Sequence, residues 1–261
     1  MTGDLQIRQI NRGLVRGSVE DGAVLCLPRT EQQRYTLAQI DNYMHLPRRK
    51  FCHEPPMTLQ LEARVSNANL SGTWGFGLWN DPFSVGVTAG GMSRLLPVLP
   101  NTAWFFYGCE ENHLTLHEDQ PGQGFHLKTF SAPLWPSFVS LVGLPILPLL
   151  LWPLTARGLR SVARGIIKED GKALSVETES WHVYRLDWLE EKVVFQIDNN
   201  TVFLTPVSPQ GRLGMVIWID NQYFRFDAKD KLGFGSLPIK SEQQLHIRNL
   251  QIKNETLSSA V

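Results

Sequence analysis

Apolar and polar residues alternate along most of this chain outside its middle third. In the segment 57–66, Leu59, Leu61 and Ala63 alternate with polar neighbours, the period-two pattern of a half-buried strand. Turn-forming residues separate such segments from one another, so many short strands and an all-β fold of two packed sheets are expected. We predict a single jelly-roll sandwich domain over residues 1–261, with strands in 57–66, 72–81, 102–108, 181–188, 192–198, 212–220 and 244–254.

A long apolar run interrupts this pattern. Residues 129–156 form 28 consecutive positions without a charged side chain, more than the roughly 20 residues that cross a bilayer core. Five prolines break the run, and each removes a helix hydrogen-bond donor. The flanking strands belong to one domain and must lie on one side of any membrane, which excludes a single crossing. The predicted insertion, 132–171, is therefore a segment that dips into a membrane and returns, a lid over a ligand cavity, or a buried insertion.

The end of the insertion has the pattern of an amphipathic helix over 155–170. Apolar residues between Leu159 and Ile166 share one face, and Arg157, Arg160, Arg164 and Lys168 fall on the opposite face. Such a helix suits the headgroup plane of an anionic membrane. The alternative is a surface helix that packs its apolar stripe on the core. The membrane hypothesis names these contact residues: Leu134, Trp135, Phe138, Leu150, Trp152, Arg157, Arg160 and Arg164.

Composition narrows the classes of partner. The 25 basic and 25 acidic residues cancel, which argues against a nucleic-acid partner. Three cysteines without a CxxC pattern indicate reduced thiols, and the N-terminus lacks the apolar core of a signal peptide. We expect a cytoplasmic protein that associates peripherally or monotopically with a membrane, and no cofactor.

Three segments together resemble a known family. They are GTWGFGLWND (72–81), WHVYRLDWLEEKVVFQIDNNTVF (181–203) and QLHIRNLQIKN (244–254). Their order is similar to that in the concanavalin A-like lectin/glucanase jelly roll, in particular the family 16 glycoside hydrolases. The resemblance implies two packed sheets with a concave groove, and it supports the fold more than an activity.

The catalytic strand of that family is missing. Those hydrolases carry a strand of the form ExDxxE or ExDxE, and retaining chemistry needs its two principal carboxyl groups about 5 Å apart. The corresponding strand here reads PNTAWFFYG, and no carboxylate occurs between Asp81 and Glu110. We therefore expect that the family's hydrolytic activity is absent.

The densest polar cluster, CEENHLTLHED (109–119), suggests other chemistry. Glu111 and His113 share a strand face and could form a proton-transferring pair near neutral pH; the alternative is an exposed hairpin end. A metal site is not expected, because His113 and His117 would lie about 13 Å apart along a strand.

Aromatic residues recur in the strands, and each faces either the core or the groove. Trp218 and Asp220 lie opposite the apolar row of 213–219, which favours the groove, and Asn80 and Asp81 follow a strand and suit a groove rim. The predicted ligand-binding residues are Trp79, Asn80, Asp81, Trp104, Tyr107, Trp218 and Asp220.

Two function classes follow. In the first, the domain binds or transforms an apolar or lipid-like small molecule, with acid–base work such as isomerisation or cyclisation by Glu111 or His113. In the second, it is a carbohydrate-binding module or diverged glycosidase held at a membrane. The lack of both a secretion signal and the carboxylate strand favours the first.

Overall fold

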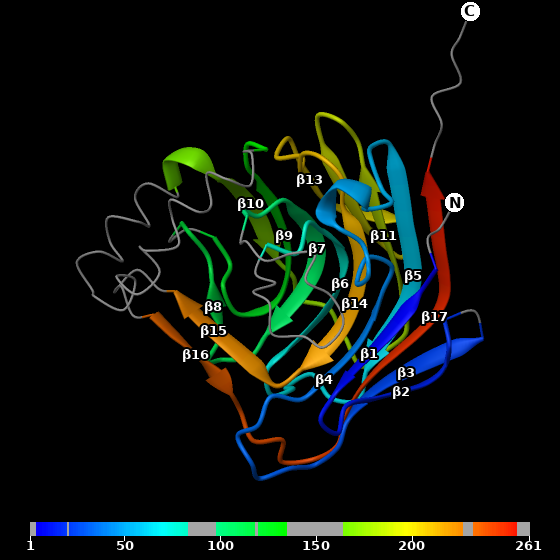
Figure 1. The fold of residues 1–261 in the computed structure, drawn as a ribbon, viewed down its shortest axis with the longest axis vertical. Coiled ribbons are helices and arrows are strands. Elements are labelled where there is room, and N and C mark those ends of the chain that lie inside the picture. The colour runs from blue at the N-terminus through cyan, green and yellow to red at the C-terminus, as the bar shows by residue number, and fades with distance from the viewer. Residues whose placement is uncertain are drawn as a thin grey trace, which may run out of the picture.

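The protein is a sandwich of two large antiparallel sheets, shown by a computed structural model (Figure 1). The structure describes residues 4–19, 21–82, 98–117, 120–134, 164–226 and 232–254. Among these residues, helix is limited to a 3₁₀ turn, η1 (Arg48–Lys50), and to the three positions 164–166. The predicted all-β jelly-roll fold is confirmed.

The first sheet has seven strands in the order β1-β4-β14-β6-β7-β9-β10. Their bounds are β1 (Gln6–Ile10), β4 (Leu37–Asp41), β14 (Gly214–Asp220), β6 (Thr73–Trp79), β7 (Thr102–Gly108), β9 (Gly124–Ser131) and β10 (Lys168–Ala173).

The second sheet has seven strands in the order β13-β12-β11-β5-β17-β3-β2. Their bounds are β13 (Asn200–Thr205), β12 (Val193–Ile197), β11 (His182–Trp188), β5 (Met57–Val65), β17 (Gln243–Asn254), β3 (Gly22–Leu27) and β2 (Leu14–Ser18). Strands from both sides of the predicted insertion are neighbours in both sheets, as β6 and β14 are in the first and β5 and β11 in the second.

A small third sheet stands beside the first. It consists of β16 (Leu232–Ser236), β15 (Gln222–Phe226) and β8 (His113–Leu114), in that order. β15 follows β14 after a single residue, Asn221, whose side chain bonds the backbone of Thr36 and Leu237. The outer face of the first sheet therefore gains a side wall (Figure 1).

Strand alternation separates the main core from this outer face, here called the groove face. On β14, Met215, Ile217 and Ile219 belong to the core between the two large sheets. Val216 and Trp218 instead join a second apolar cluster on the groove face. The period-two rule that predicts the strands thus also decides which residues are available to a ligand.

The end of the predicted insertion differs from the expectation. Residues 168–170, predicted to close an amphipathic helix, lie in β10, which pairs with β9 through Ser131 and Lys168. The helical prediction for these residues is wrong because the edge of the first sheet pairs their backbone groups. Within the described ranges, no helix has the length and apolar character needed to cross a bilayer.

Candidate functional site: an aromatic cavity on the groove face

A cavity of about 540 Å³ lies on the groove face, in the size range typical of small-molecule sites. Its floor is an aromatic cluster of Trp104, Phe106 and Trp218, with ring centroids 5.4 to 5.7 Å apart. The small third sheet contributes the side wall. The full lining is Arg8, Tyr35, Leu37, Gln39, Tyr43, Thr73, Trp79, Asp81, Trp104, Phe106, Asn112, Leu114, Val216, Trp218, Asp220, Gln222, Tyr223, Phe224 and Phe234.

Two glycines of β6 make room for the large side chains of the floor. A Cβ atom on Gly75 would lie 2.7 Å from the indole ring of Trp218, and one on Gly77 would lie 2.6 Å from the Cβ atom of Trp104. The indoles of neighbouring strands can therefore lie across β6. The alternating glycines of TWGFGLW shape the cavity floor.

One end of the cavity is polar and centres on Asp220. The Oδ1 atom of Asp220 accepts hydrogen bonds from the Thr73 hydroxyl at 2.8 Å and the Gln222 backbone N–H at 3.2 Å. The Trp218 indole N–H donates to the same Thr73 oxygen at 2.9 Å. Burial raises the pKa of Asp220 to about 7, against the opposing effect of these hydrogen bonds and of one from Tyr35. A buried carboxyl group that titrates near neutral pH marks a functional-site candidate.

Trp79, Asn80 and Asp81 mark the other end of the cavity. The Arg48 side chain donates to the backbone carbonyls of Asn80 and Asp81, which fixes the chain after β6. Trp79 and Asp81 line the cavity. Thr73, beside Asp220, lies six residues from Trp79 on β6, roughly 20 Å at strand rise. The cavity's two carboxylates, Asp81 and Asp220, therefore stand at opposite ends.

A smaller cavity of about 170 Å³ adjoins the first and shares Trp104, Leu114 and Phe224 with it. Phe130 on β9 and Ile167, directly before β10, also line it. Its remaining lining residues are Pro82, Pro100, Thr102, Thr115 and Leu116.

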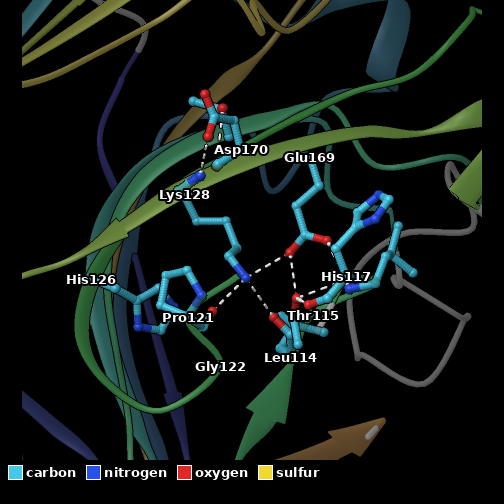
Figure 2. Close-up of polar contacts among 12 residues, drawn as sticks. Leu114, Thr115, His117, Pro121, Gly122, His126, Lys128, Glu169 and Asp170 are labelled. Atoms are coloured by element: carbon cyan, nitrogen blue, oxygen red, sulfur yellow. Dashed lines mark hydrogen bonds and ion pairs between the residues drawn. The ribbon is translucent and has the colours of Figure 1, made fainter. Parts of the chain in front are cut away.

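A buried ion pair lies next to Leu114, one of the residues that line both cavities. The side chains of Lys128 on β9 and Glu169 on β10 are 1% and 0% exposed, and their charged atoms are 2.6 Å apart. The Lys128 ammonium also donates to the carbonyls of Pro121 and Leu114, at 2.6 and 3.0 Å (Figure 2). These contacts use all three donors of the ammonium group.

Glu169 is equally well paired. Its Oε1 atom lies 2.9 Å from the Thr115 hydroxyl, and its Oε2 atom accepts the backbone N–H groups of Leu116 and His117 (Figure 2). Burial lowers the pKa of Lys128, and the Glu169 carboxylate opposes that shift. The ion pair thus holds residues 114–117 and Pro121, and Leu114 lines both cavities.

The predicted ligand residues divide by strand face. Trp79, Asp81, Trp104, Trp218 and Asp220 line the cavity. Tyr107 does not: it packs in the core, stacked on Trp74 at 5.8 Å, because it stands three positions from Trp104 on the same strand. Asn80 is buried at the rim, where its amide joins Leu99 and Asn101 rather than facing the cavity.

The predicted proton-transferring pair is also displaced. Asn112 and Leu114 line the cavity, whereas Glu111 is exposed in the turn before β8 and His113 packs beside Gly122. Neither Glu111 nor His113 lines the cavity, so the geometry gives no support to this pair as acid and base there. Among the described residues, no three His, Cys, Asp or Glu side chains gather as a metal site would require.

Most residues of the membrane hypothesis lie outside the described part of the chain: Trp135, Phe138, Leu150, Trp152, Arg157 and Arg160. Leu134 is 62% exposed and lies beside Gly211. Arg164 is exposed, and its side chain donates to the Leu116 carbonyl next to the smaller cavity.

Several residues in and around the cavity are not among the predicted site residues. Tyr35 and Gln39 belong to a segment without a strong strand pattern, and Phe106 could have been found from its even spacing from Trp104. Lys128 carried a usable signal, since it is a charged residue in the otherwise buried strand GFHLKTFS. Its partner Glu169 falls within the predicted helix 155–170, whereas the structure places it in β10. A helix would not bring it to Lys128.

No protein-family profile matches the chain, and no curated protein matches its sequence. Solved structures do resemble it. A family 16 glycoside hydrolase endo-glucanase from Bacteroides ovatus is 10% identical, with 95% of this chain and 94% of that chain covered and a TM-score of 0.50. A pseudo-β-1,3-glucanase of Mycobacterium tuberculosis is 11% identical, covers 90% of this chain and 75% of its own, and has a TM-score of 0.47.

At this level of identity the likeness to the Bacteroides ovatus enzyme shows the fold alone. The chain has the concanavalin A-like jelly roll found in family 16 glycoside hydrolases, which confirms the resemblance seen in the sequence.

Proposed function

We propose that the protein binds an apolar or lipid-like small molecule in the aromatic cavity of its groove face. The observation that carries this proposal is the cavity floor, which is built from the aromatic rings of Trp104, Phe106 and Trp218 and the aliphatic side chain of Val216. A ligand gains roughly 0.8 kcal/mol for each methylene group that such a surface removes from water.

Polar residues of the lining are largely committed to the protein itself. The Gln39 amide donates to Asp41, and Asn112 bonds the Phe224 backbone and Gly122. A sugar would need a partner for each buried hydroxyl group, since an unpaired buried polar group costs free energy. The cavity therefore suits an apolar body better than an oligosaccharide.

The separation of the two carboxylates argues against glycoside hydrolysis. Retaining and inverting enzymes hold their carboxyl groups about 5 and 6.5–9.5 Å apart. Asp81 and Asp220 stand at opposite ends of the cavity, and the strand β7 carries Trp104 and Phe106 at its groove-facing positions. The positions of these residues support a non-hydrolytic role.

Native mass spectrometry and solvent extraction of the purified protein test this proposal directly. We expect a copurifying apolar molecule, and quenching of tryptophan fluorescence by added 1-dodecanol. Val216→Trp, which fills the cavity, should abolish both signals. Val194→Trp on β12 of the second sheet, a half-buried position outside the cavity, is the matched control and should preserve them.

Three outcomes would overturn the proposal: failure of 1-dodecanol to bind, equal binding by Val216→Trp, or tighter binding of a gluco-oligosaccharide such as laminarihexaose. Tighter binding of laminarihexaose would favour the alternative that the protein is a carbohydrate-binding module or a diverged glycosidase.

We further propose that the insertion brings the protein to membrane surfaces. The support is the uncharged run 129–156 together with the exposed Leu134 and Arg164 at its described ends. Flotation with anionic and neutral vesicles tests it. Intact protein should float, more strongly with anionic vesicles and less in high salt. A chain in which a Gly/Ser linker replaces 135–163 should not float, and an intact protein that ignores both vesicles would refute the proposal.

A further inference from the structure

The polar end of the cavity carries opposite charges in one small region. Asp220 and Arg8 both line the cavity, together with Tyr35. Asp220 and Arg8 reach this end from neighbouring positions of the groove face, since Asp220 pairs with Leu37 and Arg8 pairs with Gln39, two residues further along β4. The floor beside them is aromatic. A ligand that fills the cavity must therefore meet this end with a group that suits both charges.

Asp220 is already held in place by the protein. Thr73 and Gln222 both use its Oδ1 atom, and Trp218 orients Thr73 in turn. Tyr35 lines the same end and lies two residues before Leu37, the strand partner of Asp220. Burial raises the pKa of its phenol, and the nearby Asp220 adds to that shift. A phenol and a carboxyl group at the same end of an apolar cavity offer a ligand one donor and one acceptor.

The chemistry of this pair selects a hydroxyl group. A hydroxyl group both donates and accepts, so it can accept from Tyr35 and donate to Asp220 without leaving either unpaired. A ligand carboxylate would face the Asp220 carboxyl group, and a ligand ammonium would face Arg8. Each would also lose its hydration on burial.

We propose that this end is a subsite for the hydroxyl group of an otherwise apolar, uncharged alcohol, placed between Tyr35 and Asp220. The inference rests on the proposed function, because it assumes that the cavity takes an apolar body. It adds the head group of the ligand and the two residues that recognise it.

A series of ligands with one chain and different head groups tests the subsite. Dissociation constants of 1-dodecanol, dodecyl methyl ether, dodecylamine and dodecanoate are measured by tryptophan fluorescence with the whole protein. The ether can accept from Tyr35 but cannot donate to Asp220. We expect the alcohol to bind about tenfold more tightly than the ether, as for one hydrogen bond to a carboxyl group.

Variants then locate the effect. Asp220→Asn should reduce the preference for the alcohol to about twofold or less while the ether binds as before. Tyr35→Phe should weaken the alcohol and the ether alike, because both accept a hydrogen bond from the phenol. Asp21→Asn, at an exposed position that does not line the cavity, is the matched control and should keep the full preference. Circular dichroism of each variant monitors the fold, and Tyr35→Phe keeps the test valid if Asp220→Asn does not fold.

The outcomes separate the two proposals. If no dodecyl compound binds, the proposed function fails and the subsite fails with it. If the compounds bind but the alcohol has no advantage over the ether, or the amine or the acid binds most tightly, only the subsite is refuted. An alcohol preference that survives Asp220→Asn, or affinities for the alcohol and the ether that do not change in Tyr35→Phe, would also refute it.

Discussion

Between β14 and β7 the groove face holds open space and aromatic rings, whereas between β9 and β10 it holds a filled layer around Lys128 and Glu169. In the filled half, both charges are buried and each is matched by a partner within 3.0 Å. In the open half, Asp220 is buried beside a cavity and its pKa is raised. Similar burial thus has two outcomes: the paired charges hold the backbone beside the cavities in place, and the carboxyl group with the perturbed pKa faces the open cavity.

The largest effect should come from breaking the buried pair. Lys128→Met leaves the Glu169 carboxylate buried without its cation, which should lower the free energy of unfolding by about 3–5 kcal/mol. Urea unfolding measures this loss. Arg29→Ala, in the exposed Arg29–Glu31 pair, is the control and should cost less than about 1 kcal/mol. The double variant Lys128→Met/Glu169→Leu should cost less than the sum of its single changes. Equal losses for Lys128→Met and Arg29→Ala would contradict the role of the buried pair in holding this backbone.

Asp220 should make stability depend on pH. Burial raises its pKa to about 7 in the folded protein, so the folded state holds the proton more tightly than the unfolded chain does. The resulting stability is complete below about pH 4 and is lost as the pH rises through about 7. Three pKa units correspond to on the order of 4 kcal/mol. Tyr35, which lines the same end of the cavity, stays neutral in this range because burial raises the pKa of its phenol.

Unfolding of wild type and Asp220→Asn at pH 5 and pH 8 isolates this contribution. The stability of the wild type relative to the variant should fall between the two pH values. His126, whose pKa burial lowers to about 3, contributes equally to both proteins and cancels. A relative stability that is the same at both pH values would show that Asp220 titrates normally.

Changing the cavity floor should have a smaller effect. Gly75→Ala places a methyl group against the Trp218 ring and the Phe105 carbonyl, and overpacking of this kind costs about 1–3 kcal/mol. The displaced indole should also weaken ligand binding. Gly165→Ala, where an added Cβ meets nothing within 4 Å, is the control in both thermal unfolding and binding. Equal unfolding temperatures and equal ligand affinities for the two variants would mean that the cavity floor accommodates the added methyl group without strain.

The smallest effect should follow Glu111→Gln. Its side chain is exposed in a turn and does not line the cavity. Stability should change by less than about 0.5 kcal/mol, and the affinity for 1-dodecanol by about twofold at most. A large loss of binding would restore the proton-transferring role that the sequence suggested for this residue.

The fold could be predicted because alternation and turn residues are local signals. The same rule placed Trp218 and Asp220 opposite the core row of β14, where the structure has them. It could also have excluded Tyr107, because residues three apart on one strand face opposite sides and Trp104 takes the groove side. Sorting the aromatic residues by strand face instead of by residue type removes Tyr107 from the predicted ligand-binding set.

Other features depend on contacts between distant parts of the chain. Glu111 and His113 formed an attractive pair by spacing, but the direction of β8 relative to the cavity is set by β15 and by the ion pair. Residues 168–170 have helical spacing in isolation, yet the free edge of β9 pairs with them as a strand. Neither the position of β8 nor the β9–β10 pairing can be inferred from a short stretch of sequence.

The Lys128–Glu169 contact has a topological consequence for the chain between its two residues. They lie 41 positions apart, and with the β9–β10 pairing they join the two ends of the intervening segment. The entropy of closing a loop grows only with the logarithm of its length, so doubling the segment would cost about 0.6 kcal/mol. The jelly roll can thus tolerate large changes in the length of this segment at little cost in stability. The fold itself therefore places little constraint on the segment's sequence.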